Sequence, residues 1–223
     1  MSDHHIPNAE LARLRTPLHV FNLPAISRAP TAQDGVVVSE LPHLAHVILR
    51  GQAGDAAFMQ GVASVLGASL PTQPASLVQT PGGVVQWVSP DEWWVIAPRA
   101  RRDALVASLN TALQGVFAQV VDNSGGHTAM RVTGPAHMLL LRHLGPYDFE
   151  SLTVGKAVST VMAKAVVSVC RTDDQGVVLL FRRSFADYFW RLLRRTAAPY
   201  GLCVTQPAAH ADPVFTPLLP AKH

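Results

Sequence analysis

The feature that most constrains the fold is an internal repeat with a constant spacing of 83 residues. A predicted strand ends at a glycine twice, at Gly51 and at Gly134, and a predicted hairpin turn recurs at Asp91 and at Asp174. A fixed offset between such features indicates two copies of one supersecondary unit. Each copy reads as strand, helix, hairpin and helix. The sequence therefore predicts an α+β fold of two βαββα halves, each an antiparallel sheet with helices on one face.

The repeat divides the chain into four expected segments. The two halves are residues 36–117 and 118–206. Residues 1–35 precede them as an arm that prolines interrupt and in which neither helical nor strand periodicity persists. Residues 207–223 follow as a second proline-rich segment, which we expect to be an extended tail.

Local signals place several elements within the halves. Asp55 precedes an apolar helical pattern that stops at Gly67, so we expect a helix with Asp55 as its N-cap. Residues 70–74 read as a proline-marked link that leads to the first hairpin. In the second half, residues 158–170 read as one long strand.

Three of the four tryptophans lie in the first hairpin, which is expected from strands at residues 84–88 and 93–97. Adjacent residues of a strand point to opposite faces, so Trp93 and Trp94 cannot enter the same core. We expect one of them to be core and the other to face outward. An outward tryptophan favours a protein interface, and this pair is therefore a candidate partner contact.

Composition narrows the class of protein. Apolar residues make up 48% of the chain and charged residues only 15%, which indicates that part of the surface is buried against partners. The formal net charge of +3 is too small, and the arginines too scattered, to indicate nucleic-acid binding. No run of about 18 apolar residues predicts a membrane span.

The first residues and the cysteines indicate a compartment. The N-terminal residues lack a basic region followed by an apolar run, so no export signal is predicted. Cys170 and Cys203 show neither paired spacing nor a disulfide framework, which suits a reducing environment. We therefore expect a cytoplasmic protein.

The nucleophile patterns do not point to a catalytic residue. Ser124 follows Asp122-Asn123 and precedes two glycines, which is typical of a hairpin turn and unlike a nucleophile elbow. Cys170 lies among valines of a predicted strand, where a thiol is usually inert core. The sequence therefore predicts no catalytic nucleophile.

Metal and nucleotide signals are equally weak. The histidine pairs at residues 43 and 46 and at residues 137 and 143 lack the spacing of a metal site. The glycine pairs at residues 82–83 and 125–126 lack the other glycines of a dinucleotide fingerprint. We expect neither a metal ion nor a nucleotide cofactor in this chain.

Arg182 and Arg183 are the best polar candidates, since they follow a predicted strand and precede a helix. Two guanidinium groups at such a junction suit a carboxylate or a partner's acidic residue. They equally suit simple solvation of the strand end, and the sequence does not separate the two readings.

Five short motifs occur together in one order, at residues 49–51 (Leu-Arg-Gly), 89–93 (Ser-Pro-Asp-Glu-Trp), 121–124 (Val-Asp-Asn-Ser), 131–136 (Arg-Val-Thr-Gly-Pro-Ala) and 182–186 (Arg-Arg-Ser-Phe-Ala). With this order and spacing, residues 36–203 resemble the gamma subunit of heterotetrameric sarcosine oxidase. That family is in turn similar to the folate-binding aminomethyltransferases of the glycine cleavage system.

The resemblance implies a subunit of an oxidoreductase complex. Such a complex oxidatively demethylates sarcosine to glycine, passes the one-carbon unit to tetrahydrofolate and produces hydrogen peroxide. The alpha, beta and delta subunits would be the partners of this chain. The FAD, FMN and NAD would lie in the alpha and beta subunits, and the folate chemistry in alpha. The chain itself is expected to carry no cofactor and to be structural.

One departure separates the chain from the active aminomethyltransferases. The resemblance places their catalytic aspartate just before the strand that matches residues 166–170, yet residues 160–171 contain no carboxylate here. The departure disfavours an aminomethyltransferase activity in this chain. The alternative is a stand-alone folate-binding aminomethyl- or methyl-transferase-like protein, and a folate-independent scaffold for another amine-demethylating flavoenzyme also stays open.

Overall fold

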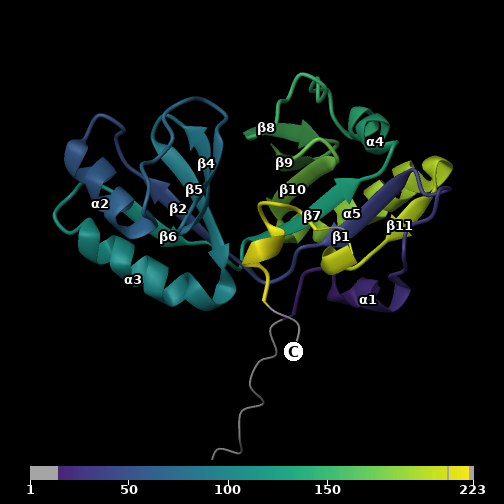
Figure 1. Cartoon of the computed structure of the whole chain (residues 1–223), viewed down its shortest axis with the longest axis horizontal. Coiled ribbons are helices and arrows are strands. Elements are labelled where there is room, and N and C mark those ends of the chain that lie inside the picture. The colour runs from purple at the N-terminus through teal and green to yellow at the C-terminus, as the bar shows by residue number, and fades with distance from the viewer. Residues whose placement is uncertain (1–14, 210, 221–223) are drawn as a thin grey trace, which may run out of the picture.

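Two β-sheets form the centre of the molecule in the computed structural model, which describes residues 15–209 and 211–220 (Figure 1). One sheet has the strand order β3-β4-β5-β2-β6 and the other the order β11-β1-β7-β10-β9-β8. The strands are β1 (Val36–Glu40), β2 (Leu44–Arg50), β3 (Leu77–Thr80), β4 (Gly83–Ser89), β5 (Glu92–Pro98), β6 (Gln119–Asp122), β7 (His127–Thr133), β8 (Lys156–Met162), β9 (Ala165–Arg171), β10 (Gly176–Arg182) and β11 (Leu202–Val204).

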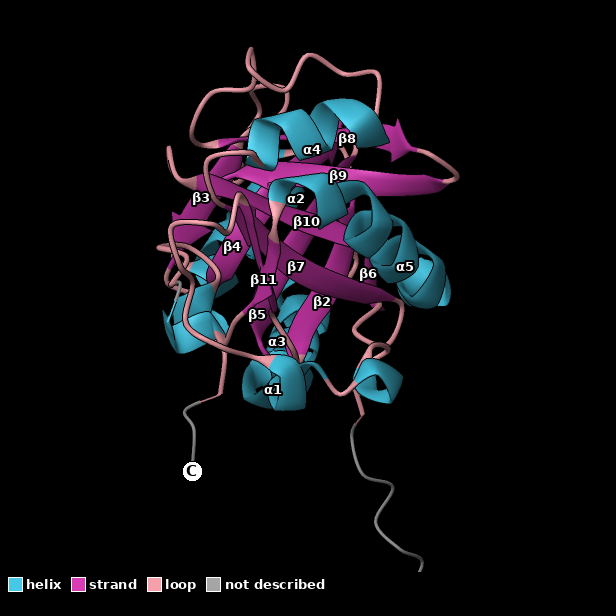
Figure 2. Cartoon of the chain, turned by 90° about the vertical axis from the view of Figure 1, so that its right-hand side faces the viewer, coloured by secondary structure: helices cyan, strands magenta, loops and turns pink. Residues whose placement is uncertain are grey.

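Helices cover only the outer face of each sheet, as the sequence predicts. In the first half these are α2 (Ala56–Leu66) and α3 (Arg102–Ala112), and in the second half α4 (His137–Leu144) and α5 (Ala186–Ala197). Figure 2 shows α4 and α5 in front of β9, β10 and β7. All strand pairs are antiparallel except β1 with β11, which is parallel. The predicted α+β fold with two antiparallel halves is therefore confirmed.

The repeat is visible in the elements themselves. Strand β2 spans residues 44–50 and β7 spans residues 127–133, an offset of 83 at both ends. In each half three strands, not the expected two, lie between the two long helices, so that the repeated unit that begins at β2 or β7 reads βαβββα. An additional strand, β1 or β6, precedes this unit in each half, and β11 follows the second one. The link expected at residues 70–74 does not lead directly into the hairpin, because β3 lies between them.

The prediction of a single strand at residues 158–170 is wrong. Strands β8 and β9 replace it, and they pair residue by residue down to Met162 opposite Ala165. The two-residue turn between them holds Ala163 at a φ of 51°. Such turns usually contain glycine or asparagine, so Ala163-Lys164 gives no turn signal in the sequence.

The glycines that mark the repeat are required by close packing. A Cβ atom at Gly51 would lie 2.5 Å from the ring of Phe58, which is too close. A Cβ atom at Gly134 would lie 2.5 Å from the carbonyl oxygen of Gly35, and Gly134 also has a φ of 95°. Only glycine fits where each half turns from its first strand toward its first helix.

The two halves exchange their opening strands. Strand β1 precedes β2 along the chain but pairs with β7 of the second half. Strand β6 precedes β7 but pairs with β2 of the first half. The division of the chain expected at residues 117 and 118 therefore does not separate the two sheets. Neither sheet can form completely from one half alone.

Three apolar cores give the molecule four layers. One core lies between α2, α3 and the first sheet, and another lies between α4, α5 and the second sheet. The third core lies between the two sheets and includes Leu44 and Ile96 of the first sheet and Val178 and Leu180 of the second. The order of layers is helix, sheet, sheet, helix, which agrees with Figure 1.

The predicted ends of α2 are confirmed. The Asp55 carboxylate accepts hydrogen bonds from the backbone N–H groups of Ala57 and Phe58, which otherwise have no partner in the helix. Gly67 ends the helix with a φ of 73° in the left-handed region.

The terminal segments contact the folded halves. Part of the N-terminal arm lies in residues 1–14, outside the described residues, and the rest contains the short helix α1 (Leu23–Ile26). The C-terminal tail is not simply extended, because short 3-10 helices form at Pro207–Ala209 and Thr216–Leu218. Phe215 of the tail is completely buried in the core between the sheets. Among the described residues, no helix has the length and apolar character needed to cross a bilayer.

Candidate functional site: the cavity between the halves

A cavity of about 140 Å³ lies where the two halves meet at one end of the sheets. Both halves contribute to its wall. The lining includes the start of β2, the residue that follows β5, the turn between β6 and β7, and the residue that follows β10. The charged and polar side chains in this lining are those of Arg15, Thr16, His43, His46, Arg99, Ser124, His127, Thr128 and Arg183.

Two of the lining arginines occupy equivalent positions of the repeat. Arg99 is the first residue after β5, and Arg183 is the first residue after β10. Each opens the short 3-10 turn that precedes the long helix of its half. The Arg183 side chain donates a 3.4 Å hydrogen bond to the carbonyl oxygen of Gly125. The structure therefore brings together two guanidinium groups that are 84 residues apart in the sequence.

Histidine rings line the same cavity. The His46 and His127 ring centres are 5.6 Å apart, and Trp94 packs against His127 at 4.7 Å. Burial, together with smaller contributions from the nearby His127 and Arg99, lowers the pKa of His46 to about 3. Burial also lowers the pKa of His127 to about 4, with Arg182 contributing. Both imidazoles are therefore neutral at pH 7.

Ser124 lines the cavity but is held by the turn that contains it. Its hydroxyl donates to the Asp122 carboxylate and accepts from the backbone N–H of His46. Its backbone N–H also donates to Asp122 at 3.0 Å. No histidine ring bonds the hydroxyl among the described residues, so no base is placed to activate it. The predicted structural turn at Ser124 is confirmed.

Both cysteines are buried in the second sheet. Cys170 lies in the core between the sheets, and burial raises the pKa of its thiol to about 12. Cys203 is buried in β11, and burial also raises the pKa of its thiol. Thiols of this kind are poor nucleophiles at neutral pH because little thiolate forms.

The two adjacent tryptophans point to opposite faces of β5. Trp93 is 0% exposed, contacts Phe58 under the helices of the first half, and donates a 2.8 Å hydrogen bond to the carbonyl oxygen of Pro71. Trp94 is half-buried and packs at the edge of the core between the sheets. The face opposite Trp93 therefore meets the second sheet as well as solvent.

Arg182 and Arg183 point to different environments. Arg182 is exposed at the end of β10 and is absent from the cavity lining, whereas Arg183 is part of it. The sequence indicated Arg183 but gave no reason to combine it with Arg99. The repeat offset of 83 pairs Arg99 with Arg182, so the pairing with Arg183 comes from the structure, in which β5 and β10 are offset by 84 residues.

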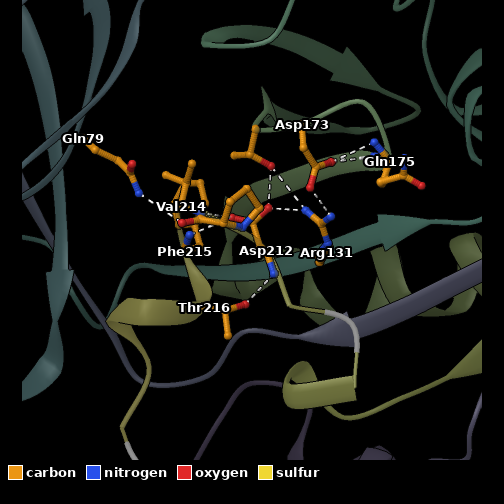
Figure 3. Close-up of polar contacts among 11 residues, drawn as sticks. Gln79, Arg131, Asp173, Gln175, Asp212, Val214, Phe215 and Thr216 are labelled. Atoms are coloured by element: carbon orange, nitrogen blue, oxygen red, sulfur yellow. Dashed lines mark hydrogen bonds and ion pairs between the residues drawn. The ribbon is translucent and has the colours of Figure 1, made fainter.

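A second polar cluster fixes the C-terminal tail to the second sheet (Figure 3). Arg131 of β7 forms an ion pair with Asp212 of the tail and a 2.6 Å ion pair with Asp173. Thr172 also donates to the Asp212 carboxylate. The other Asp212 oxygen accepts from the backbone N–H groups of two following residues, Val214 and Phe215.

Metal ligands do not gather in the part of the chain that the structure describes. There, no three histidine, cysteine or acidic side chains lie close enough to hold one ion. His43 and His46, which the sequence singled out, share the cavity instead with arginines and no acidic residue.

Comparison with known proteins gives the family. The model of the sarcosine oxidase, gamma subunit family, matches residues 50–199. The chain belongs to this family. A sarcosine oxidase subunit gamma from Arthrobacter sp. is 33% identical over 170 residues, which cover 74% of this chain and 80% of that relative. The corresponding subunit of Corynebacterium sp. (strain P-1) is 31% identical over 167 residues, with the same coverage of each chain.

Solved structures agree with this assignment. One chain of the heterotetrameric sarcosine oxidase from Corynebacterium sp. U-96, solved with pyrrole 2-carboxylate, superposes with a TM-score of 0.75 and 26% identity. The match covers 84% of this chain and 96% of that one. The aminomethyltransferase of the glycine cleavage system from Bartonella henselae gives a TM-score of 0.67 at 12% identity, covering 88% of this chain and 60% of that one. This second match shows a shared fold alone.

Proposed function

We propose that this chain is the gamma subunit of a heterotetrameric sarcosine oxidase and assembles with alpha, beta and delta subunits. The observation that carries the proposal is the match to a chain of such a complex over 96% of that chain's length. A match of this extent leaves no large segment of the known subunit without a counterpart here. Family membership over residues 50–199 supports the same assignment.

The complex would oxidise the N-methyl group of sarcosine, release glycine and hydrogen peroxide, and pass the one-carbon unit to tetrahydrofolate. Its FAD, FMN and NAD would be held by the other subunits and would supply the redox chemistry. We place the complex in the cytoplasm, which suits two buried cysteines without a disulfide.

Within the complex, this chain is proposed to be structural and not catalytic. The serine and the two thiols that chemistry could use are held by hydrogen bonds or buried, as described above. Residues 160–171, where the resemblance implies an aspartate in the active transferases, contain no carboxylate. The chain would therefore stabilise the assembly.

An exposed apolar edge supports a docking role. Phe117 is 91% exposed, and Val121 of the edge strand β6 is 46% exposed. Phe117 borders a surface hollow of about 390 Å³ that also contains Arg50 and Asp91, which form an ion pair. A large aromatic side chain left in water beside a hollow is typical of a protein interface. The half-buried Trp94 and the exposed Arg182 are further proposed contacts.

Affinity purification tests the assembly. A tagged form of this chain, expressed in its source cells, should recover larger subunits that carry flavin absorbance. Phe117→Ser should reduce this recovery without lowering the melting temperature, since the ring contributes little to the fold. Leu139→Ser, at another exposed apolar position in α4, is the matched control and should leave recovery unchanged. A lone monomer in every preparation would contradict the proposal.

A folate titration tests the non-catalytic assignment separately. Calorimetry of the purified chain with a reduced folate should show no saturable heat at micromolar concentrations. Micromolar binding would instead favour the stand-alone folate-binding transferase.

A further inference from the structure

We propose that the cavity between the halves binds a free small oxyanion, a carboxylate or inorganic phosphate, between Arg99 and Arg183. Both residues line one cavity, Arg99 directly after β5 and Arg183 directly after the corresponding strand β10. The inference goes beyond the role of the chain as a subunit and does not depend on it.

The positive charge of the cavity lining favours an anion as the ligand. Arg15, Arg99 and Arg183 all line the cavity, and no aspartate or glutamate does. Among the described residues, none of the three arginines forms an ion pair, whereas Arg131 and Arg28 each pair with a buried carboxylate. Guanidinium groups that converge without an acidic partner repel one another, and a bound anion removes that repulsion. Their planar arrays of N–H donors match the geometry of carboxylate and phosphate oxygens.

A buried His46 nitrogen without a hydrogen-bond partner also favours a ligand in the cavity. His46 is 4% exposed and lines the cavity, and its Nδ1 atom has no hydrogen-bond partner among the described residues. A buried polar atom without a partner costs free energy, so its ligand is usually water, an ion or a small molecule. A neutral imidazole can carry its proton on Nδ1 and donate it to an oxyanion. Thr128 and Gly125 line the same cavity.

Size limits the ligand class. A cavity of about 140 Å³ has room for an anion of a few heavy atoms. Pockets that enclose a nucleotide or a drug-sized molecule are typically about 300–1,000 Å³. Acetate and inorganic phosphate are therefore suitable probes, and larger acids are not.

Calorimetry at constant ionic strength tests the site. Sodium phosphate and sodium acetate would each be titrated into the full chain in a sodium chloride background. We expect one-site saturation for at least one of them. Arg99→Gln and Arg183→Gln should each weaken its Kd by about tenfold or more, because each removes charge-assisted hydrogen bonds.

Arg182→Gln is the matched control, since Arg182 adjoins Arg183 but is absent from the cavity lining. It removes the same charge and should weaken the Kd clearly less than Arg183→Gln does, because Arg182 is exposed beside His127 and does not itself line the cavity. Thermal melts would show whether each variant is folded. If Arg99→Gln unfolds the chain, Arg183→Gln still tests the site, because Arg183 is exposed and its replacement should not disturb the fold. No saturation with either anion, or equal Kd values for Arg182→Gln and Arg183→Gln, would overturn the proposal.

The assembled complex distinguishes a free anion from a partner's carboxylate. The titration would compare the complex that contains the unmodified chain with the complex that contains Arg183→Gln. If the two complexes still differ in their Kd for the anion, the result supports binding of a free anion. Loss of the Arg183-dependent heat on assembly would mean that an acidic side chain of a partner fills the cavity, and the proposal would be wrong.

Discussion

Arg131 and Asp212 form an ion pair in which both side chains are almost completely buried, at 3% and 0% exposure. The two residues are 81 positions apart, one in the central strand β7 and the other in the C-terminal tail. Asp212 also accepts from the backbone of the tail, and this places Phe215 in the core between the sheets. The pair therefore joins the tail to the fold.

Replacing one member of this pair should be strongly destabilising. Asp212→Ala leaves the buried Arg131 guanidinium with one carboxylate partner, Asp173, and the Thr172 hydroxyl, and it removes the bonds that shape the tail. We expect a loss of about 3–5 kcal/mol in the free energy of unfolding, measured by urea denaturation. Asp174→Ala, which removes an exposed carboxylate, is the control and should cost less than about 0.5 kcal/mol. Equal stabilities for the two variants would contradict this role.

The two tryptophans of β5 should respond differently to replacement by alanine. Trp93 is fully buried against Phe58, so Trp93→Ala should lower the free energy of unfolding by about 3–5 kcal/mol. Trp94 is half-buried and packs on His127, so Trp94→Ala should cost about 1–2 kcal/mol and leave the chain folded. Recovery of partner subunits should fall with the folded Trp94 variant. Two equal unfolding defects would contradict the assignment of the two faces.

Stability should fall as the pH is lowered from about 6.5 to about 4. In this window an unfolded histidine binds a proton, whereas the folded-state pKa values of His46 and His127, about 3 and about 4, keep both rings neutral. Protonation therefore favours the unfolded chain, by up to about 1.4 kcal/mol per pH unit for each ring. Urea denaturation of His46→Gln across this range should give a shallower slope than the unmodified chain. The same slope in both would contradict a neutral, buried His46.

Neither cysteine should react with a thiol reagent in the folded chain. Burial raises the pKa of both thiols, and both side chains are buried in the fold. A colorimetric disulfide reagent should detect no thiol before unfolding and two after urea is added. Rapid reaction of one thiol in the native chain would show that a cysteine is accessible.

The sequence predicts local and periodic features of this fold well. The repeat appears in the offset between Gly51 and Gly134 because each glycine meets a close contact that no other residue fits. The N-cap of α2 at Asp55 is also predictable from the sequence, because its hydrogen bonds join residues only two and three positions apart. The family resemblance, carried by five motifs, is confirmed by the comparisons.

Features that depend on tertiary contacts are not predicted. The exchange of β1 and β6 leaves no trace in the hydrophobic pattern, because either partner sheet buries the same face of the strand. The turn at Ala163 lacks a turn residue, so β8 and β9 read as one strand. The contact of Asp212 with Arg131 and the shared cavity of Arg99 and Arg183 join positions more than 80 residues apart.

The most direct test of the central claim is reconstitution of the complex. The alpha, beta and delta subunits would be co-expressed with and without this chain. Light scattering would give the mass of the particle, and a separate assay would measure its sarcosine-dependent production of hydrogen peroxide. We expect a stable particle of four different subunits and full activity only when this chain is present. A complete and fully active particle without it, with this chain eluting alone as a monomer, would contradict its assignment as the gamma subunit.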